Sequence, residues 1–301
     1  MRLGISCLAL LVAVLCLAGV TAASGSATFS DPAGDTPAAA PDLTNVTVSN
    51  DDQGLITFHI TVANRSALGP DDVVAVLIGT DDPNAFAGRR DDGINFVLVL
   101  DGTQGASLLE WNGIDLDPID PSPGSVGGSF SGGAATLTVR QEDLAPGFPD
   151  LSVPIQLDFV VLGIAFSGND VVAQDDAPEA DFWHYRLSEP LRVIVTNFDA
   201  GKTVKAGKTL VVLMGAAHGD TGAAVTKGKV TCRARLGNRA LRGKGAFVTV
   251  IVRAAGASVK SPNAACSWKV PKNSKGKTIR GTMTLSESGV ANTRSFTTHV
   301  R

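Results

Sequence analysis

Apolar and polar side chains alternate strictly between residues 55 and 62 of this 301-residue chain. The apolar positions are Ile56, Phe58, Ile60 and Val62, with threonine or histidine between them. A period of two is typical of a strand with one buried face and one solvated face. Gly54 supplies the positive φ that a short hairpin loop needs, so we expect residues 43–48 to pair antiparallel with residues 55–62.

Similar short runs recur along the chain and predict an all-β protein, since glycine is abundant, aromatic residues are few and long helical periodicity is absent. Residues 73–79 are apolar on both faces, which predicts a central strand covered on both sides. Residues 115–133 are rich in Pro, Gly and Ser and predict a long loop, and residues 141–144 predict a single helical turn. The other strands are expected at residues 94–100, 108–111, 136–140, 155–161, 182–187, 193–197, 209–214, 230–236, 247–253, 266–270, 279–285 and 295–300.

Charge divides the chain into two unlike halves. Residues 24–190 hold 26 acidic residues against 5 arginines and no lysine, a difference of −21. Residues 191–301 hold 20 lysines and arginines against 3 acidic residues, a difference of +17. So sharp a step predicts a domain boundary near Pro190, with an acidic β-sandwich before it and a basic β-sandwich after it.

Residues 1–23 have the layout of a cleaved secretory signal. Arg2 precedes an apolar run over residues 5–20, and the small residues Val20-Thr-Ala-Ala23 follow it. The run is short for a membrane span, although an uncleaved anchor is the alternative. We therefore expect an extracellular protein, secreted or surface-associated, with no membrane span after cleavage.

Two cysteines, Cys232 and Cys266, remain after removal of that signal. In an exported protein we expect them to form a disulfide rather than a free pair. Alternation within residues 230–236 and 266–270 points both cysteines inward and places Trp268 beside their bridge.

Several motifs of the acidic half come in an order that resembles the family-9 carbohydrate-binding-module-like, or DOMON-like, sandwiches of secreted bacterial proteins. The resemblance covers residues 28–188 and implies a jelly-roll-like sandwich, often stabilised by calcium, that binds sugars or, in some relatives, haem. The motifs are Asp31-Pro-Ala-Gly-Asp35, Pro41-Asp-Leu43, Leu77-Ile-Gly-Thr-Asp-Asp-Pro-Asn84, Glu110-Trp-Asn-Gly113 and Asp175-Asp-Ala-Pro178 followed by Trp183.

The basic half, residues 191–301, resembles bacterial immunoglobulin-like modules, which serve as spacers or adhesive units. Seven expected strands agree with such a sandwich. The motifs that carry the resemblance are Val230-Thr-Cys232, Cys266-Ser-Trp268 and Gly276-Lys-Thr-Ile-Arg-Gly281.

Oxygen-bearing side chains gather at the ends of the expected strands in the acidic half, as a calcium site requires. The alternative is that they form solvated turns, which Asp and Asn commonly do. The candidate ligands are Asp31, Asp35, Asp42, Asp81, Asp82, Asn84, Asp175 and Asp176.

A sugar site needs aromatic faces beside hydrogen-bonding groups. The available platforms are Trp111, Trp183 and Tyr185, with Asn112 next to the first. The alternative is that these strand aromatics belong to the core.

Haem is not expected, because the acidic half has no methionine and its histidines, His59 and His184, lie in no attachment motif. An enzyme is not expected either, since no His-Glu-x-x-His or Gly-x-Ser-x-Gly motif occurs. Close acidic pairs such as Asp115 and Asp117 arise by chance among so many acids.

The basic half places its cations where an anionic cell-wall polymer or glycan would meet them through screened electrostatics. Nucleic acid is a poor candidate for an exported domain with few exposed aromatics, and the alternative is that the basic face docks on the acidic domain. The cations are Arg233, Arg235, Arg253, Lys269 and Arg280 on outward faces, with Lys272, Lys275 and Lys277 in a loop. The leading hypothesis is thus a non-catalytic binding protein of the carbohydrate-recognition type, and the runner-up is a structural envelope or adhesion protein.

Overall fold

The computed structural model describes residues 23–80, 93–119, 121, 124–145, 151–254 and 257–301. The expected signal sequence therefore lies almost wholly outside the described residues. Among those described, no helix is long and apolar enough to cross a membrane. Nearly all regular structure is β, which confirms the predicted fold class.

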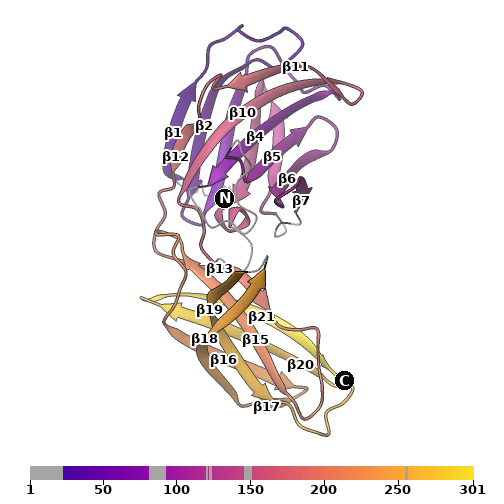
Figure 1. Cartoon of the computed structure of the whole chain (residues 1–301), viewed down its shortest axis with the longest axis vertical. Helices are drawn as coiled ribbons and strands as arrows, with labels where there is room; N and C mark the ends of the chain where they lie inside the picture. The colour runs from indigo at the N-terminus through magenta and orange to yellow at the C-terminus, as the bar shows by residue number, and fades with distance from the viewer. Residues whose placement is uncertain (1–22, 81–92, 120, 122–123, 146–150, 255–256) are drawn as a thin grey trace, which may run out of the picture.

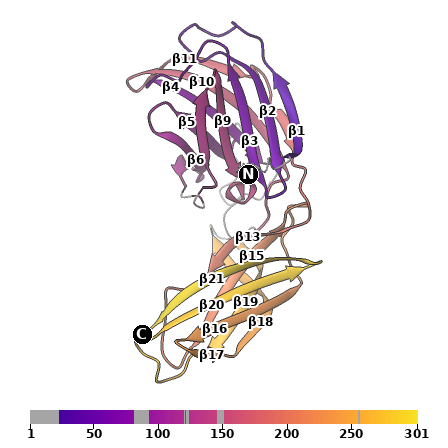
Figure 2. The same cartoon turned by 180° about the vertical axis from the view of Figure 1, so that it is seen from behind.

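Two sheets face each other in the first sandwich (Figures 1 and 2). One sheet has the strand order β1 (Ala23–Ser30), β2 (Leu43–Asp51), β3 (Leu55–Val62), β9 (Ala134–Arg140) and β8 (Gly127–Ser131). The other has the order β11 (Asp170–Ala177), β10 (Gln156–Ser167), β4 (Asp72–Thr80), β5 (Phe96–Asp101), β6 (Gly105–Trp111) and β7 (Leu116–Pro118), and β12 (Trp183–Arg186) pairs with β10.

The predicted hairpin of β2 and β3 forms with the expected pairing and lies at the centre of the first sheet. The apolar residues of β3 point inward into one core cluster with the inner faces of β4, β5 and β10. Gly54 closes the turn at a φ of +72°. An added Cβ there would also lie 1.8 Å from Nη2 of Arg192, so a side chain at this position would displace that guanidinium group.

Three details of the first sandwich correct the sequence predictions. Residues 115–133 are not one long loop, because they contain β7 and the edge strand β8. Asp175 and Asp176 lie within β11 rather than in a loop. Strand β4 is sealed on its inner face, but Val73 and Leu77 on its outer face are only partly buried and line an open groove. Glycine, serine and aspartate disfavour strands locally, and pairing with a neighbour overrides that preference.

The second sandwich also consists of two sheets. One has the order β13 (Val193–Asp199), β15 (Thr209–His218), β19 (Ala257–Lys269) and β18 (Gly243–Ala254). The other has the order β14 (Thr203–Val204), β21 (Val290–Val300), β20 (Thr278–Glu287), β16 (Lys229–Leu236) and β17 (Arg239–Leu241). This division of the strands, with β14 parallel to β21, is that of an immunoglobulin-like sandwich.

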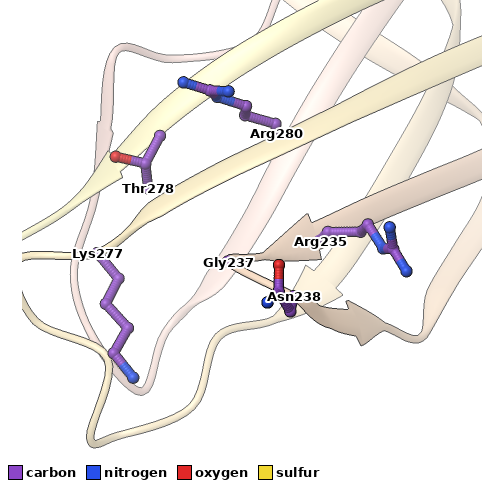
Figure 3. Close-up of a pocket in the computed structure, with 6 residues that line it drawn as sticks. All are labelled: Arg235, Gly237, Asn238, Lys277, Thr278 and Arg280. Carbon is purple, nitrogen blue, oxygen red and sulfur yellow. The ribbon is translucent and has the colours of Figure 1, made fainter.

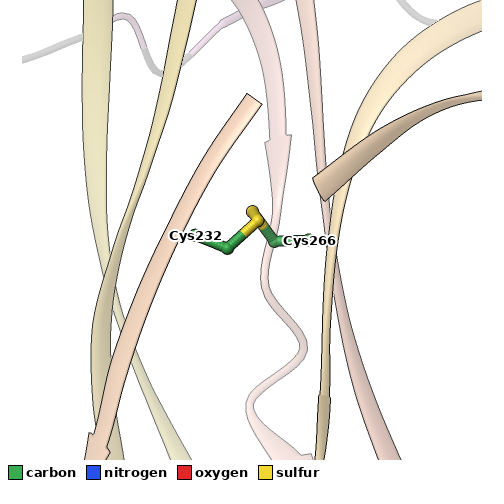
Figure 4. The surroundings of a disulfide bond; sticks show 2 residues. All are labelled: Cys232 and Cys266. Atoms are coloured by element: carbon green, nitrogen blue, oxygen red, sulfur yellow. A yellow bond between two sulfur atoms is a disulfide. The ribbon is translucent and has the colours of Figure 1, made fainter. Parts of the chain in front are cut away.

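The predicted disulfide joins Cys232 on β16 to Cys266 on β19 and so links the two sheets (Figure 4). Trp268 is 1% exposed and packs with its ring centroid 5.3 Å from that of Phe296. In antibody domains the corresponding bridge joins the second and sixth strands instead. In this sandwich β15 and β20 take the places of those two strands, and Met214 and Met283 fill their inner faces.

The two sandwiches meet at a small interface centred on Arg192. Its Nε donates to Glu189 at 2.9 Å, and its Nη2 donates to Oε1 of Gln141 at 2.5 Å. Gln141 in turn donates through Nε2 to the carbonyl of Gly219 in the second sandwich. Apolar contacts of Val153 with neighbours in the second sandwich complete the junction.

Candidate functional site

Aspartates from distant parts of the chain meet at the end of the first sandwich that lies away from the second (Figure 1). Asp31 follows β1 directly, Asp35 lies in the loop to β2, and Asp175 belongs to β11. One carboxylate oxygen from each lies within 4.8 Å of the others. The fold thus brings together three of the residues that the sequence nominated as calcium ligands.

Asp31 is the central residue of this acidic cluster. It is 9% exposed, and its Oδ2 has no hydrogen-bond partner among the described residues. Burial raises its pKa to about 7, and the negative charges of Asp35, Glu179, Asp175 and Asp42 act in the same direction. A buried carboxylate without a cation or a donor is costly, so this geometry favours a positive charge between the carboxylates.

Asp175 and Asp42, the neighbours of Asp31 in the cluster, each accept hydrogen bonds from the backbone. Asp175 accepts a hydrogen bond through Oδ2 from the backbone amide of Leu43 at 2.6 Å, and burial raises its pKa. Both carboxylate oxygens of Asp42 accept from the amide of Gly34, at 3.2 and 3.1 Å. Asp42 therefore shapes the loop that carries Asp35, whereas Asp31, Asp35 and Asp175 each place one carboxylate oxygen where a cation could be shared.

The remaining calcium candidates do not join the cluster in the described structure. Asp176 follows Asp175 on a strand and so points to the opposite face, where it accepts a hydrogen bond from Gln174 at 2.5 Å. Asp81, Asp82 and Asn84 lie outside the described residues. Glu179, which is not among the predicted ligands, contributes a negative charge that helps to raise the pKa of Asp31. Glu179 directly follows the motif at residues 175–178, and this position in the sequence could have identified it as part of the cluster.

The donor set determines which metals the cluster fits. All three groups are carboxylates, with no histidine or thiolate among them. Hard cations such as Ca²⁺ prefer oxygen ligands, whereas Zn²⁺ and Cu²⁺ prefer nitrogen or sulfur. Calcium usually takes six to eight oxygens, so backbone carbonyls and water would have to supply the rest.

The nominated aromatic residues are largely used by the fold. Tyr185 is 4% exposed and donates its hydroxyl hydrogen to Oδ1 of Asn50 at 2.7 Å. Trp183 stacks on Phe29, with centroids 5.3 Å apart, and meets Phe159 edge-on. Trp111 is half-buried at the end of β6.

Asn112, next to Trp111, is occupied by the turn that follows β6. Its Oδ1 accepts from the amides of Ile114 and Asp115, and its Nδ2 donates to Asp117 at 2.7 Å. These three hydrogen bonds hold the turn in place, as Asn commonly does after a strand.

A cationic pocket of about 400 Å³ lies beside the turn between β16 and β17 in the second sandwich (Figure 3). Arg235 on β16 and Arg280 on β20 are directly opposite each other in the sheet, and Lys277 lines the same hollow. No ion pair neutralises these three side chains within the described part of the chain. At the junction of the two sandwiches, the cation paired with Glu142 and Glu189 is Arg192, which does not line this pocket.

Comparison with known proteins leaves the chain without an assigned family. No protein-family model matches the sequence, and no curated protein matches it. Among solved structures, the titin Ig tandem domains A164-A165 match with a TM-score of 0.21 and 12% identity, over 82% of this chain and 87% of that chain. A chimeric titin Z1Z2-Z1Z2 tandem carrying an exogenous fibronectin peptide matches with a TM-score of 0.22 and 11% identity, over 83% and 92%.

Scores this low carry no argument, so the class of each sandwich rests on its own geometry. The second sandwich is immunoglobulin-like by its strand order and cross-sheet disulfide. No comparison supports the resemblance of residues 28–188 to family-9 carbohydrate-binding-module-like or DOMON-like domains. The chain as a whole is an all-β protein of two sandwiches.

Proposed function

We propose that this chain is a non-catalytic binding protein, secreted or held at the cell surface, whose acidic sandwich binds Ca²⁺ through Asp31, Asp35 and Asp175. The observation that carries the proposal is the buried, unpartnered Oδ2 of Asp31, which faces two further carboxylates. A divalent cation there neutralises the mutual repulsion of the three groups.

Calcium in this position has a structural consequence. Asp31 and Asp35 belong to the connection between β1 and β2, whereas Asp175 belongs to β11 in the opposite sheet. A shared cation therefore clamps the two sheets together at one end of the sandwich, where the hydrogen bond from Leu43 to Asp175 already links them. The clamp fixes the loops at that end for contact with a partner.

The decisive experiment compares the unfolding of the full chain with and without calcium, in the native protein and in Asp31→Asn. In chelator we expect Asp31→Asn to be more stable than the native chain, because the change removes a buried and unpaired charge. In calcium we expect the order to reverse, since ligand binding adds about 2.7 kcal/mol to the native chain when free calcium is 100-fold above Kd.

Asp220→Asn is the matched control, because Asp220 is an exposed aspartate of the second sandwich. It should leave the calcium-induced shift in melting temperature unchanged. If calcium does not stabilise the native chain, or if Asp31→Asn keeps the full shift, the metal site is refuted and the structural envelope or adhesion protein becomes the better description.

A second function is favoured by the cationic pocket. Like charges directly opposite on neighbouring strands are destabilising, so Arg235 and Arg280 are better explained by an anionic partner than by the fold. We assign this pocket to an anionic polymer of the cell surface. The long side chains of Arg235 and Arg280 point in different directions and can contact successive anionic groups along such a polymer (Figure 3).

Binding to inorganic polyphosphate at several salt concentrations tests this assignment. Arg235→Ala and Arg280→Ala should each weaken binding and lower its dependence on salt, because each removes one phosphate contact. Lys227→Ala, an exposed lysine elsewhere in the second sandwich, is the matched control. Equal losses in all three variants would mean that net charge, not this pocket, binds the polymer.

Carbohydrate recognition by the acidic sandwich depends on Trp111, since Trp183 and Tyr185 are packed against the core. A glycan screen of the full chain, repeated with Trp111→Ala, tests it. Loss of a glycan signal with unchanged melting temperature would support a sugar site, and an unchanged signal would remove Trp111 from it.

A further inference from the structure

The outer face of the seven-stranded sheet carries an apolar groove that the functions proposed above do not use. Its volume is about 580 Å³, which falls in the range of small-molecule sites. Aliphatic side chains form its floor, and Phe166 is the aromatic residue among its lining side chains. The apolar lining residues are Pro70, Val73, Ala75, Leu77, Val97, Val99, Leu116, Leu162, Ile164 and Phe166.

Strand register explains why these side chains form one continuous floor. Ala75 on β4 pairs with Leu162 on one side and with Val99 on the other. Leu77, two residues along β4, is flanked in the same way by Val160 and Val97. Because paired residues point to the same face, these rows are apolar on their outer side across β10, β4 and β5, as they are on the core side. Figure 1 shows that none of the described strands crosses in front of this face.

Two carboxylates line one end of the groove. Asp71 and Asp101 line the end where β4 begins, and Asp176 is paired with Leu162 at the side. Asp158, paired with Gly79 farther along β4, does not line the groove and is hydrogen-bonded to His184 at 2.7 Å. Among the described strands of this sheet, the arginine is Arg186 on β12, and it does not line the groove.

An aliphatic floor with an acidic end has a definite chemical complement. A polyol would find one aromatic ring to stack on, and an anionic lipid would meet repulsion from the rim. We propose that the groove binds a small amphiphile with an aliphatic body and a cationic head, with the head between Asp71 and Asp101. The body then covers the rows of Ala75 and Leu77.

Asp71 is the better residue for testing the head group. Asp101 already accepts through Oδ1 from Thr103 and Gln104 in its own turn, so its replacement would disturb the fold. Asp71 is exposed at the rim. Asp71→Asn therefore changes the charge of the groove while leaving the turn intact, and Asp220→Asn is the matched control.

The experiment is calorimetric titration of the full chain with dodecyltrimethylammonium and with dodecanoate, both kept below micelle-forming concentrations. We expect the cation to bind at least tenfold more tightly than the anion. Asp71→Asn should reduce that preference severalfold, and Asp220→Asn should not. Leu162→Lys, which places a cation on the floor, should abolish binding of the cationic probe.

Melting temperature and circular dichroism show whether each variant is folded. If Leu162→Lys does not fold, Val99→Thr provides a milder change of the groove floor, and we expect it to lower the affinity for the cationic probe. Equal affinity for the two probes, no binding of either, or an unchanged preference in Asp71→Asn would overturn the proposal. Concentration-dependent dimers that Leu162→Lys dissociates would also overturn it, because the occupant would then be a second copy of the chain. Asp31→Asn should bind the cationic probe normally, so this result is independent of the metal site.

Discussion

The two sandwiches of this protein handle like charge in opposite ways. In the first, short aspartate side chains converge at Asp31, where burial and mutual repulsion raise the pKa of that carboxyl. In the second, long cationic side chains such as Arg235 and Arg280 stay exposed on the outer face of a sheet. A compact cluster of carboxylates fits a single small cation, whereas an extended row of guanidinium groups fits a long polyanion.

The sandwiches also differ in what reinforces their cores. The second has the disulfide between Cys232 and Cys266, which crosses from one sheet to the other. The first has no cysteine from residue 24 to its end. Its sheets are joined at the acidic end by the contact of Leu43 with Asp175. The Ca²⁺ proposed at Asp31, Asp35 and Asp175 would link the two sheets of the first sandwich, as the disulfide links those of the second.

Loss of the disulfide should give the largest effect and should separate the two sandwiches most clearly. The bridge spans 34 residues of sequence, and the chain-entropy argument gives a loss of about 4 kcal/mol in the unfolding free energy when both cysteines are replaced by serine. Calorimetry should show the transition of the second sandwich moving to lower temperature while that of the first stays in place. Equal movement of both would show that the sandwiches unfold as one unit.

Arg192→Ala tests how strongly the two unlike sandwiches are coupled. The Arg192 side chain is 18% exposed and its partner Glu189 is 1% exposed, so the change leaves a buried carboxylate without its cation. We expect a loss of about 3 kcal/mol and a wider separation of the two calorimetric transitions. Adding Glu189→Gln should recover part of the loss. Arg186→Ala, at an exposed position of β12, is the control and should change little.

The stability of the metal-free protein should depend on pH through the acidic cluster of the first sandwich. Asp31 has a pKa of about 7 when folded and 3.8 as a free side chain, so the folded state binds more protons between these values. Stability therefore falls as pH rises from 4 to 7, by at most about 1.4 kcal/mol per pH unit for this proton. Urea unfolding in chelator at pH 5 and pH 7.5 measures it. Asp31→Asn should show a flatter profile, and an identical profile would contradict the assignment.

Arg280→Thr should give the smallest effect, with the opposite sign. Removing one of two directly opposed arginines relieves repulsion and should stabilise the second sandwich by about 0.2–1 kcal/mol at low salt. High salt should erase the gain, because screening weakens the repulsion in the native chain. A destabilised variant would mean that the side chain of Arg280 packs usefully against the sheet.

The candidate site was only partly predictable. The sequence nominated Asp31, Asp35 and Asp175 but gave equal weight to Asp176, which the pleat of β11 turns to the other face. Aspartates look alike in sequence, and their convergence depends on how β1, β2 and β11 are placed against one another. The apolar outer face of β4 was visible in residues 73–79, but whether another layer covers it depends on the whole fold.

Local patterns and long-range geometry therefore determined different things. Alternation over residues 55–62, the inward direction of both cysteines and the opposite charge of the two halves follow from neighbouring residues and composition, so the sequence alone determined them. The meeting of Asp31 with Asp175, the contacts of Arg192 and the open face of β4 were decided by the tertiary structure. Each depends on register and packing between segments far apart in the chain, which no local preference encodes.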